Sequence, residues 1–342
     1  MELSLIFATA ANAVLPILLL ILLGYGLRRL GLINEDFTKL GNNLVFNVFL
    51  PLMLFDNVYT IESFSSINWP LVVYVVFIIC LLFAIGYLAA VCSTKVPERR
   101  GVIMQCSYRS NFAIIGIPLA SALGGPEAIA VTAVVSAFSM PFYNVFSVVS
   151  LTMFMKDGSG KRQSMKSVMK SVVTNPLIIA VGLGFVVLII RLVQNALFDR
   201  TVFSLSEHLP FVYSAIKSAA SIASPFALIV MGAQFTFSAV KGMFKEIAVG
   251  TLFRIVIAPL IGIGLAILLT TYTDWFTCGV NEFPALVAFF GSPMAISGAV
   301  MAMQMGNDEQ LSTQLVVWPS IFSILTIFIT VCLLLPAGFL AA

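Results

Sequence analysis

The chain has 342 residues, of which 60% are hydrophobic and only 10% are charged, whereas roughly 25% of the residues in an ordinary soluble domain are charged. Its 18 Lys and Arg and 15 Asp and Glu residues are too few to solvate the surface of a chain this long, so most of that surface must face lipid. The net charge of +3, without basic residues interleaved with aromatic ones, excludes a nucleic-acid partner. The five cysteines have no repeated spacing, which favours buried thiols over a disulfide framework or a metal site.

Apolar runs separated by charges, Pro and Gly predict an all-α polytopic membrane protein with ten transmembrane helices. Because ten spans consume most of the chain, no sizeable soluble domain fits beside them. The first run follows Asn12 and lacks a positive segment before it, so we expect a membrane helix and no cleaved signal peptide. The predicted spans are 11–30, 37–57, 69–93, 101–123, 127–155, 169–193, 211–237, 243–271, 283–304 and 310–337.

Basic residues predict the orientation of these spans. Thirteen of the 18 fall in alternating connections, and the positive-inside rule places those connections in the cytoplasm. The longest of them, the linker 156–168, is expected to be a solvated cytoplasmic loop. Both termini then lie outside the cytoplasm, in the inner (plasma) membrane of the cell. The thirteen residues are Arg28, Arg29, Lys39, Lys95, Arg99, Arg100, Lys156, Lys161, Arg162, Lys166, Lys170, Lys241 and Lys245.

Prolines at matching positions indicate an internal repeat, with residues 1–155 as one five-span unit and 169–342 as the other. Because five is an odd number, the second unit enters the membrane from the opposite side, and the repeats are inverted. Inverted repeats with Pro-interrupted helices are typical of secondary transporters; the alternative is duplicated helices with ordinary kinks. The matching pairs are Pro16 with Pro176, Pro51 with Pro225, Pro118 with Pro293, and Pro141 with Pro319.

Two spans combine polar residues with a predicted break near the membrane centre. Span four is expected to break at Gly116 and Pro118, with its outer half beginning near Leu119, and span nine at Pro293, with its inner half beginning near Met294. Both half-helices would then direct their partially positive N-termini at one point, which favours an anionic substrate. The expected substrate-binding residues are Arg109, Ser110, Asn111, Gly116, Pro118, Ser292, Pro293, Ser297 and Asn47.

Several of these polar residues have a second interpretation that involves no substrate. Asn111 contacts either the substrate or a neighbouring helix. Arg109 has either a substrate or gating role or a structural one, because a long side chain at this depth can reach the interface. Arg254, in span eight, is expected to reach the cytoplasmic interface rather than a ligand.

Two further pairs leave alternatives open. Asn43 and Asn47 share one face of span two, where they either line a path or pack between helices. Asp56 and Lys217 occupy related positions in the two halves. Asp56 is a candidate for carrying a coupled proton; the alternatives are a pair with Lys217 or two interfacial charges.

At these residues the chain resembles the auxin efflux carrier family, which includes plant auxin exporters and bacterial permeases for malate or malonate. The resemblance implies a ten-helix fold like that of sodium/proton antiporters and bile-acid transporters, in which broken helices four and nine cross. It also implies a scaffold of spans one, two, six and seven, a transport domain formed by spans three to five and eight to ten, and a homodimer. It rests on the stretches 43–51, 110–119, 175–180, 254–260 and 293–304.

Two departures from related families bear on the substrate and the coupling ion. Ser297 stands where bacterial relatives usually have Asn, four residues beyond the proline, and the shorter side chain leaves room for a different or larger anion. The acidic residue that sodium-coupled bile-acid transporters place in the ninth helix is missing here, which argues against sodium coupling.

We therefore expect a secondary active transporter of a small organic anion, such as a dicarboxylate or an auxin-like weak acid, that works by alternating access. The spans contain no H-E-x-x-H or G-x-S-x-G motif, so neither an enzyme nor a cofactor is expected. The alternatives are a channel-like uniporter and a non-transporting membrane sensor.

Overall fold

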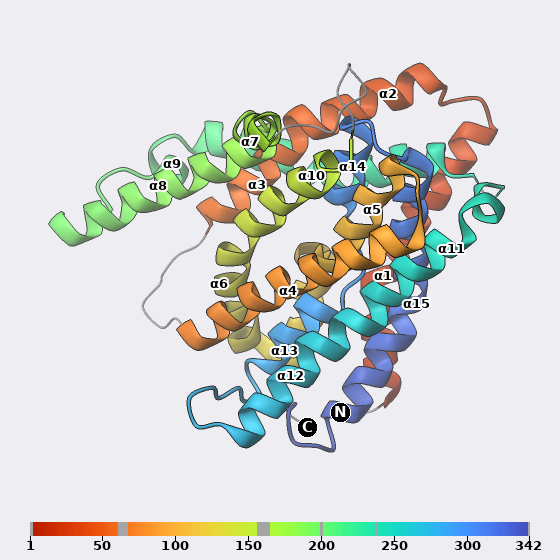
Figure 1. Ribbon diagram of the computed structural model, residues 1–342. Coiled ribbons are helices and arrows are strands. Elements are labelled where there is room, and N and C mark those ends of the chain that lie inside the picture. Colours follow the sequence, from red (N-terminus) through yellow and green to blue (C-terminus); the bar gives the residue numbers. More distant parts are fainter. Residues whose placement is uncertain (1–2, 61–67, 156–164, 199–200, 237, 341–342) are drawn as a thin grey trace.

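The computed structural model describes residues 3–60, 68–155, 165–198, 201–236 and 238–340 (Figure 1). The regular elements of these residues are all helices, with no strand among them. Six of these helical segments are long and apolar enough to cross a membrane. The division into ten spans and the inverted repeat stay predictions. Most of the predicted linker, residues 156–164, and Arg200 lie outside the described residues. The six segments are Trp69–Ser93, Leu119–Ser136, Pro176–Phe198, Pro210–Gln234, Ala239–Tyr272 and Glu309–Leu334.

The helices follow one another in chain order, with four short π-helical segments between them. The elements are α1 (Leu3–Arg29), α2 (Glu35–Leu44), η1 (Val45–Phe49), α3 (Leu50–Tyr59), α4 (Trp69–Ser93), α5 (Pro97–Tyr108), η2 (Phe112–Gly116), α6 (Ile117–Thr152), α7 (Met165–Val173), α8 (Pro176–Phe198), α9 (Leu205–His208), α10 (Pro210–Gln234), α11 (Ala239–Leu252), η3 (Phe253–Ile257), α12 (Ala258–Tyr272), α13 (Phe283–Leu286), η4 (Val287–Gly291), α14 (Ile296–Gln304) and α15 (Glu309–Leu334).

Proline explains three of the π-helical segments. Pro51, Pro118 and Pro259 each come directly after a residue whose backbone N–H bonds to the carbonyl five residues earlier. A proline has no N–H, and its ring displaces the carbonyl four residues before it. The turn ahead of each proline therefore widens to the π pattern, and the helix continues with a bulge instead of ending.

Helix α6 covers parts of two predicted spans, which meet at Gly125. This residue has φ 63° and ψ −153° inside an otherwise helical run, and Pro126 follows it. Only glycine adopts this backbone conformation without strain. The turn between predicted spans four and five is therefore made by one glycine.

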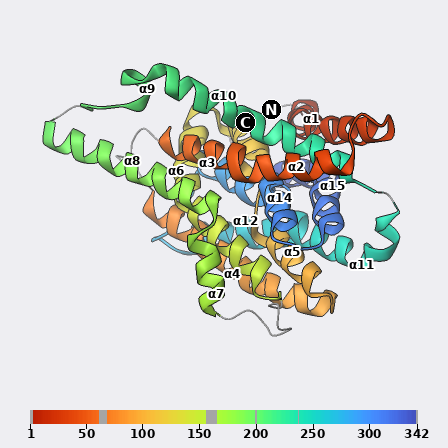
Figure 2. The same ribbon diagram turned by 90° about the horizontal axis from the view of Figure 1, so that it is seen from above.

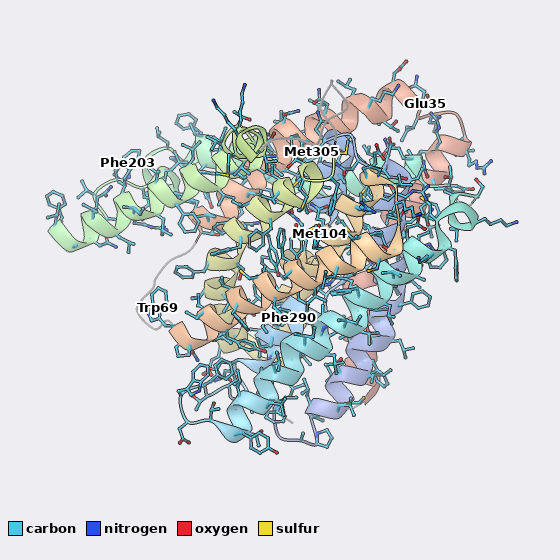
Figure 3. The ribbon with its side chains drawn as sticks, in the orientation of Figure 1. Glu35, Trp69, Met104, Phe203, Phe290 and Met305 are labelled. Carbon is cyan, nitrogen blue, oxygen red and sulfur yellow. The ribbon has the colours of Figure 1, made fainter. Side chains whose placement is uncertain are left out.

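Close crossings and an apolar exterior characterise the packing. Helix α1 packs against α10, and α3 packs against α8, which projects to one side of the molecule in both ribbon views (Figures 1 and 2). A Cβ atom on Gly232 of α10 would lie 2.0 Å from the carbonyl oxygen of Ile21 in α1, so only glycine allows this approach. Figure 3 shows Phe290 inside the bundle, where it is buried, and Trp69 and Phe203 at its periphery, where both are exposed.

Candidate functional site

Two extended segments cross near the middle of the bundle. Helix α5 ends at Tyr108 and the chain becomes helical again at Phe112, while η4 ends at Gly291 and α14 begins at Ile296. Within these breaks Ser110 and Met294 form an isolated antiparallel bridge.

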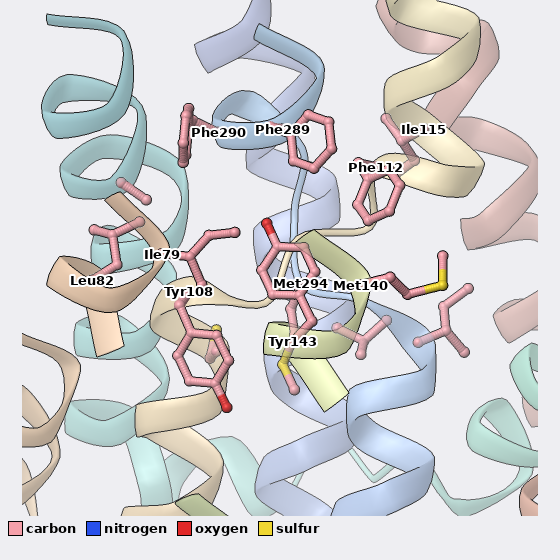
Figure 4. Close-up of a cluster of buried hydrophobic side chains, with 14 of the residues drawn as sticks. Ile79, Leu82, Tyr108, Phe112, Ile115, Met140, Tyr143, Phe289, Phe290 and Met294 are labelled. Atoms are coloured by element: carbon pink, nitrogen blue, oxygen red, sulfur yellow. The ribbon is translucent and has the colours of Figure 1, made fainter. Parts of the chain in front are cut away.

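Backbone hydrogen bonds join the two breaks directly. The N–H of Asn111 donates to the carbonyl of Pro293 at 2.8 Å, and the N–H of Ala295 donates to the carbonyl of Arg109 at 3.2 Å. Above the crossing, the rings of Phe112 and Phe289 stack with their centroids 4.5 Å apart (Figure 4). Each break therefore satisfies part of the backbone of the other, which lipid cannot do.

The position of the first break differs from the sequence-based prediction. Gly116 and Pro118, expected to mark it, lie on a continuous helix, and the break falls earlier, at Arg109 to Asn111. The prediction was wrong because the turn ahead of Pro118 widens to a π-helical bulge, which lets the helix continue through the proline. The half-helix after the first break begins at Phe112, not near Leu119. Pro118 and Pro293 consequently do not mark equivalent points of the two halves.

In the second break the sequence located the interruption correctly. Ser292 and Ala295 have extended backbones on either side of Pro293 and Met294. The half-helix after the second break begins at Ile296, two residues beyond the expected position. Gly116 has a packing role at the crossing: a Cβ atom there would lie 2.8 Å from the carbonyl oxygen of Ala288 in η4.

On one side of the crossing, the buried side chain of Arg254 binds the ends of both half-helices. Its guanidinium donates to five carbonyl oxygens, two at the end of α5 and three at the end of η4. The N–O distances are 3.5 Å to Ser107, 3.2 Å to Tyr108, 3.0 Å to Phe289, 2.9 Å to Phe290 and 2.9 Å to Ser292.

This geometry overturns the expectation that Arg254 reaches the cytoplasmic interface. Carbonyls at the C-terminal end of a helix lack intrahelical partners and carry partial negative charge. Because the two breaks place such ends together inside the protein, the guanidinium turns inward, where its five donors match them. Arg254 is 0% exposed.

On the other side, Arg109 is also buried, but its partners are neutral and come from α6 and α14. It donates to the carbonyl of Tyr143 at 3.0 Å, to Oδ1 of Asn144 at 3.1 Å, to Oγ of Ser297 at 3.0 Å, and to Oγ of Ser147. Among the described residues no ion pair includes Arg109.

A buried carboxylate is present among the described residues, but it pairs with another arginine. Glu246 is the one carboxylate among the buried residues of the described chain, and it pairs with Arg99 at 3.0 Å. Arg99 also binds Asp308 at 2.9 Å. These acids hold α5, α11 and the start of α15 together, and the positive charge of Arg109 is left without an anionic partner.

A cavity of about 50 Å³ borders Arg109. Three polar groups around it, Oγ of Ser110, Nδ2 of Asn144 and the hydroxyl of Tyr143, are buried and have no hydrogen-bond partner. The N-terminal ends of η2 and α14 also lie at this cavity. It is lined by Leu50, Met53, Leu54 and Asn57 of α3, Arg109, Ser110, Asn111, Phe112, Met140, Tyr143, Asn144, Ser224 of α10, Ala295, Ile296 and Ser297.

The polar groups around the cavity suit an anion, but the cavity is smaller than an organic anion. Its volume suits one or two water molecules. Unpaired buried donors each cost roughly 1–3 kcal/mol, and an acceptor ligand would relieve that cost. Within the described residues no group of three His, Cys, Asp or Glu side chains could hold a metal ion.

The structure gathers four of the predicted site residues at this cavity and leaves others away from it. Those at the cavity are Arg109, Ser110, Asn111 and Ser297. Ser292 and Pro293 belong to the second break but do not line the cavity. Asn47 is exposed and donates to the carbonyl of Asn43 at 3.0 Å.

Asp56, the candidate for proton coupling, lies outside the cavity lining. One of its carboxylate oxygens accepts a hydrogen bond of 2.9 Å from the hydroxyl of Tyr213 in α10. Lys217 is exposed, and the ion pairs of the described residues do not include one with Asp56. Its role in coupling stays a prediction.

Sequence reasoning missed Tyr143 and Asn144, which supply α6's contribution to the site. The signal was present, because an amide in the middle of an apolar span must face protein or water. That argument was applied to Asn111 and holds equally for Asn144, three residues after Pro141.

The comparisons with known proteins agree with a membrane carrier. The family model described as "Membrane transport protein" matches residues 9–331. An uncharacterized transporter of Methanocaldococcus jannaschii is 25% identical over 254 residues, which cover 72% of this chain and 76% of the relative. An uncharacterized transporter of Methanothermobacter thermautotrophicus is 23% identical over 329 residues, covering 94% of this chain and 97% of the relative.

Proposed function

The chain belongs to the membrane transport protein family, that of the auxin efflux carriers, and on that premise we propose that it is a secondary transporter of a small organic anion. The observation that carries the proposal is Arg109, a buried cation in a helix break that has only neutral partners and borders a cavity. A carboxylate is the ligand that this arrangement favours.

The proposed binding mode uses residues that already line the cavity. A carboxylate would accept charge-assisted hydrogen bonds from Arg109, which are about twice as strong as neutral ones. The unpaired Nδ2 of Asn144 and Oγ of Ser110 would donate to it as well. The first N–H groups of α14 and η2 favour the same negative charge. A dicarboxylate or an auxin-like weak acid has this chemistry.

The packing supports alternating access between two bodies. Helices α1, α3, α8 and α10 pack on one another, and they correspond to the proposed scaffold. The cavity lies between residues of α3 and α10, which belong to this group, and residues of the two breaks and α6, which do not. Displacement of the breaks relative to α3 and α10 would therefore widen it. We include in this proposal the ten spans, the inverted repeat, a homodimer, and a plasma-membrane orientation with both termini outside the cytoplasm.

Reconstitution of the purified protein into liposomes tests the proposal. We expect saturable uptake of radiolabelled malate or indole-3-acetate into liposomes that contain the same unlabelled anion, above that of protein-free liposomes, and its loss in Arg109→Gln. Lys241→Gln, which removes an exposed cation of α11, is the matched control and should transport normally. Saturable uptake that survives Arg109→Gln would contradict the site.

Two other outcomes would favour the alternatives. Flux that never saturates, or single-channel currents, would indicate a channel-like uniporter. Thermal stabilisation by the anion without any flux would indicate a sensor.

Asp56 is tested by the substitution Asp56→Asn. If this residue carries the coupled proton, the variant should lose pH-driven accumulation of the anion and keep counterflow. Preserved pH dependence would remove Asp56 from the mechanism.

A further inference from the structure

We infer that the protein is an obligate anion exchanger, whose site crosses the membrane only when an anion is bound. The inference rests on the proposed function, because it requires that the crossing holds the substrate. It follows from comparing the charges on the two sides of the crossing.

On the Arg254 side the charges balance. Each helix C-terminus carries about −0.5 of an elementary charge, and Arg254 binds the carbonyls of two such ends, α5 and η4. The sum of both ends with one guanidinium is close to zero. This side of the crossing therefore needs no mobile ion.

On the Arg109 side the charges all have one sign. The N-termini of α14 and of the continuous helix η2–α6 each contribute about +0.5, in addition to the full charge of Arg109. An arginine stays protonated inside proteins, so this charge cannot be removed by releasing a proton. Among the described residues the buried carboxylate is Glu246, which binds Arg99 instead.

Unpaired polar groups beside Arg109 support the same inference. Ser110, Tyr143 and Asn144 each keep a buried polar atom unpaired at or beside the cavity. All three atoms can donate a hydrogen bond. One acceptor group can satisfy several such donors together with the cation, and an anion with one or two negative charges supplies it.

Movement of the empty site is therefore opposed by its own charge. Transfer of uncompensated positive charge through a low-dielectric region is strongly unfavourable. The two N-termini and Arg109 together carry about +2, which a bound malate dianion cancels and a bound monoanion halves. The return half of the transport cycle then requires a second anion from the opposite compartment. Net uptake into vesicles without internal anion should be slow, and exchange should be fast.

Proteoliposomes with and without internal substrate test this inference. Both sets contain the wild-type protein, equal potassium on the two sides and valinomycin to hold the membrane potential at zero. One set is loaded with unlabelled malate, and the other contains only a sulfonate buffer without chloride or carboxylate. Initial uptake of external radiolabelled malate is measured in both, and the pair is repeated with indole-3-acetate.

We expect at least a tenfold higher initial rate in the loaded vesicles. Equal saturable rates in loaded and empty vesicles would overturn obligate exchange and leave the proposed transport function standing. Absence of saturable uptake of either probe in both sets would overturn the transport function and, with it, the exchange. The two failures are thus distinguished by the same measurement.

Discussion

The two buried arginines at the crossing have the same side chain and different surroundings. Arg254 is surrounded by carbonyls from the C-terminal ends of two half-helices, and Arg109 by side chains and one carbonyl that are all neutral. The first cation completes the hydrogen bonding of two helix ends, while for the second we propose that a ligand supplies the negative charge that the surrounding groups lack. Burial alone therefore does not distinguish a structural charge from a functional one; the partners do.

Removing Arg254 should have the largest effect, and on stability. Arg254→Gln leaves several buried carbonyls at the ends of α5 and η4 without donors, and each acceptor left unpaired costs about 1–3 kcal/mol. We expect the purified variant to unfold in detergent at a markedly lower temperature than the wild type. Size-exclusion chromatography after heating measures the fraction that stays folded. A variant with wild-type stability would show that the five bonds are not what holds the crossing together.

Removing Arg109 should weaken anion binding and leave stability nearly unchanged. Arg109→Gln removes a buried charge that has no counter-ion, so the free energy of unfolding should stay within about 1 kcal/mol of wild type or rise. Binding of malate or indole-3-acetate should weaken at least 100-fold, or about 2.8 kcal/mol. Calorimetric titration measures the binding, and parallel heating curves measure the stability. A large loss of stability with unchanged affinity would reverse the roles assigned to the two arginines.

An internal carboxylate should compete with the substrate for Arg109. In Asn144→Asp a charged carboxylate oxygen stays at the place of Oδ1, 3.1 Å from the guanidinium, and the second oxygen replaces the unpaired Nδ2 donor. We expect about a tenfold weaker anion affinity, or about 1.4 kcal/mol, with little loss of fold. Asn144→Ser removes the amide without adding charge and serves as the control. If the Asp and Ser variants bind equally, the charge of Arg109 is not what recruits the anion.

The sequence predicted what depends on local pattern and missed what depends on distant pairing. Apolar runs and the charges between them indicate helices and lipid, because hydropathy and length act within each segment. The first break lies where Ser110 meets Met294, and no spacing near Gly116 and Pro118 reveals that contact. Arg254 was misplaced for the same reason, since its acceptors come from two segments that are far apart in the chain.

The smallest effect is expected at Gly298, which makes room for Arg109 on α14. A Cβ atom there would lie 3.1 Å from Cδ of Arg109 and 3.3 Å from Cδ of Gln105, so Gly298→Ala should shift the guanidinium by a few tenths of an ångström. A shift of that size should raise the KM for malate about twofold to fivefold, less than 1 kcal/mol. Gly264→Ala is the matched control, because no atom lies within 4 Å of a Cβ at that position. The two alanine variants gain the same helix propensity, so a difference in KM between them reports on the position of Arg109. Equal KM values would mean that the site tolerates displacement of Arg109.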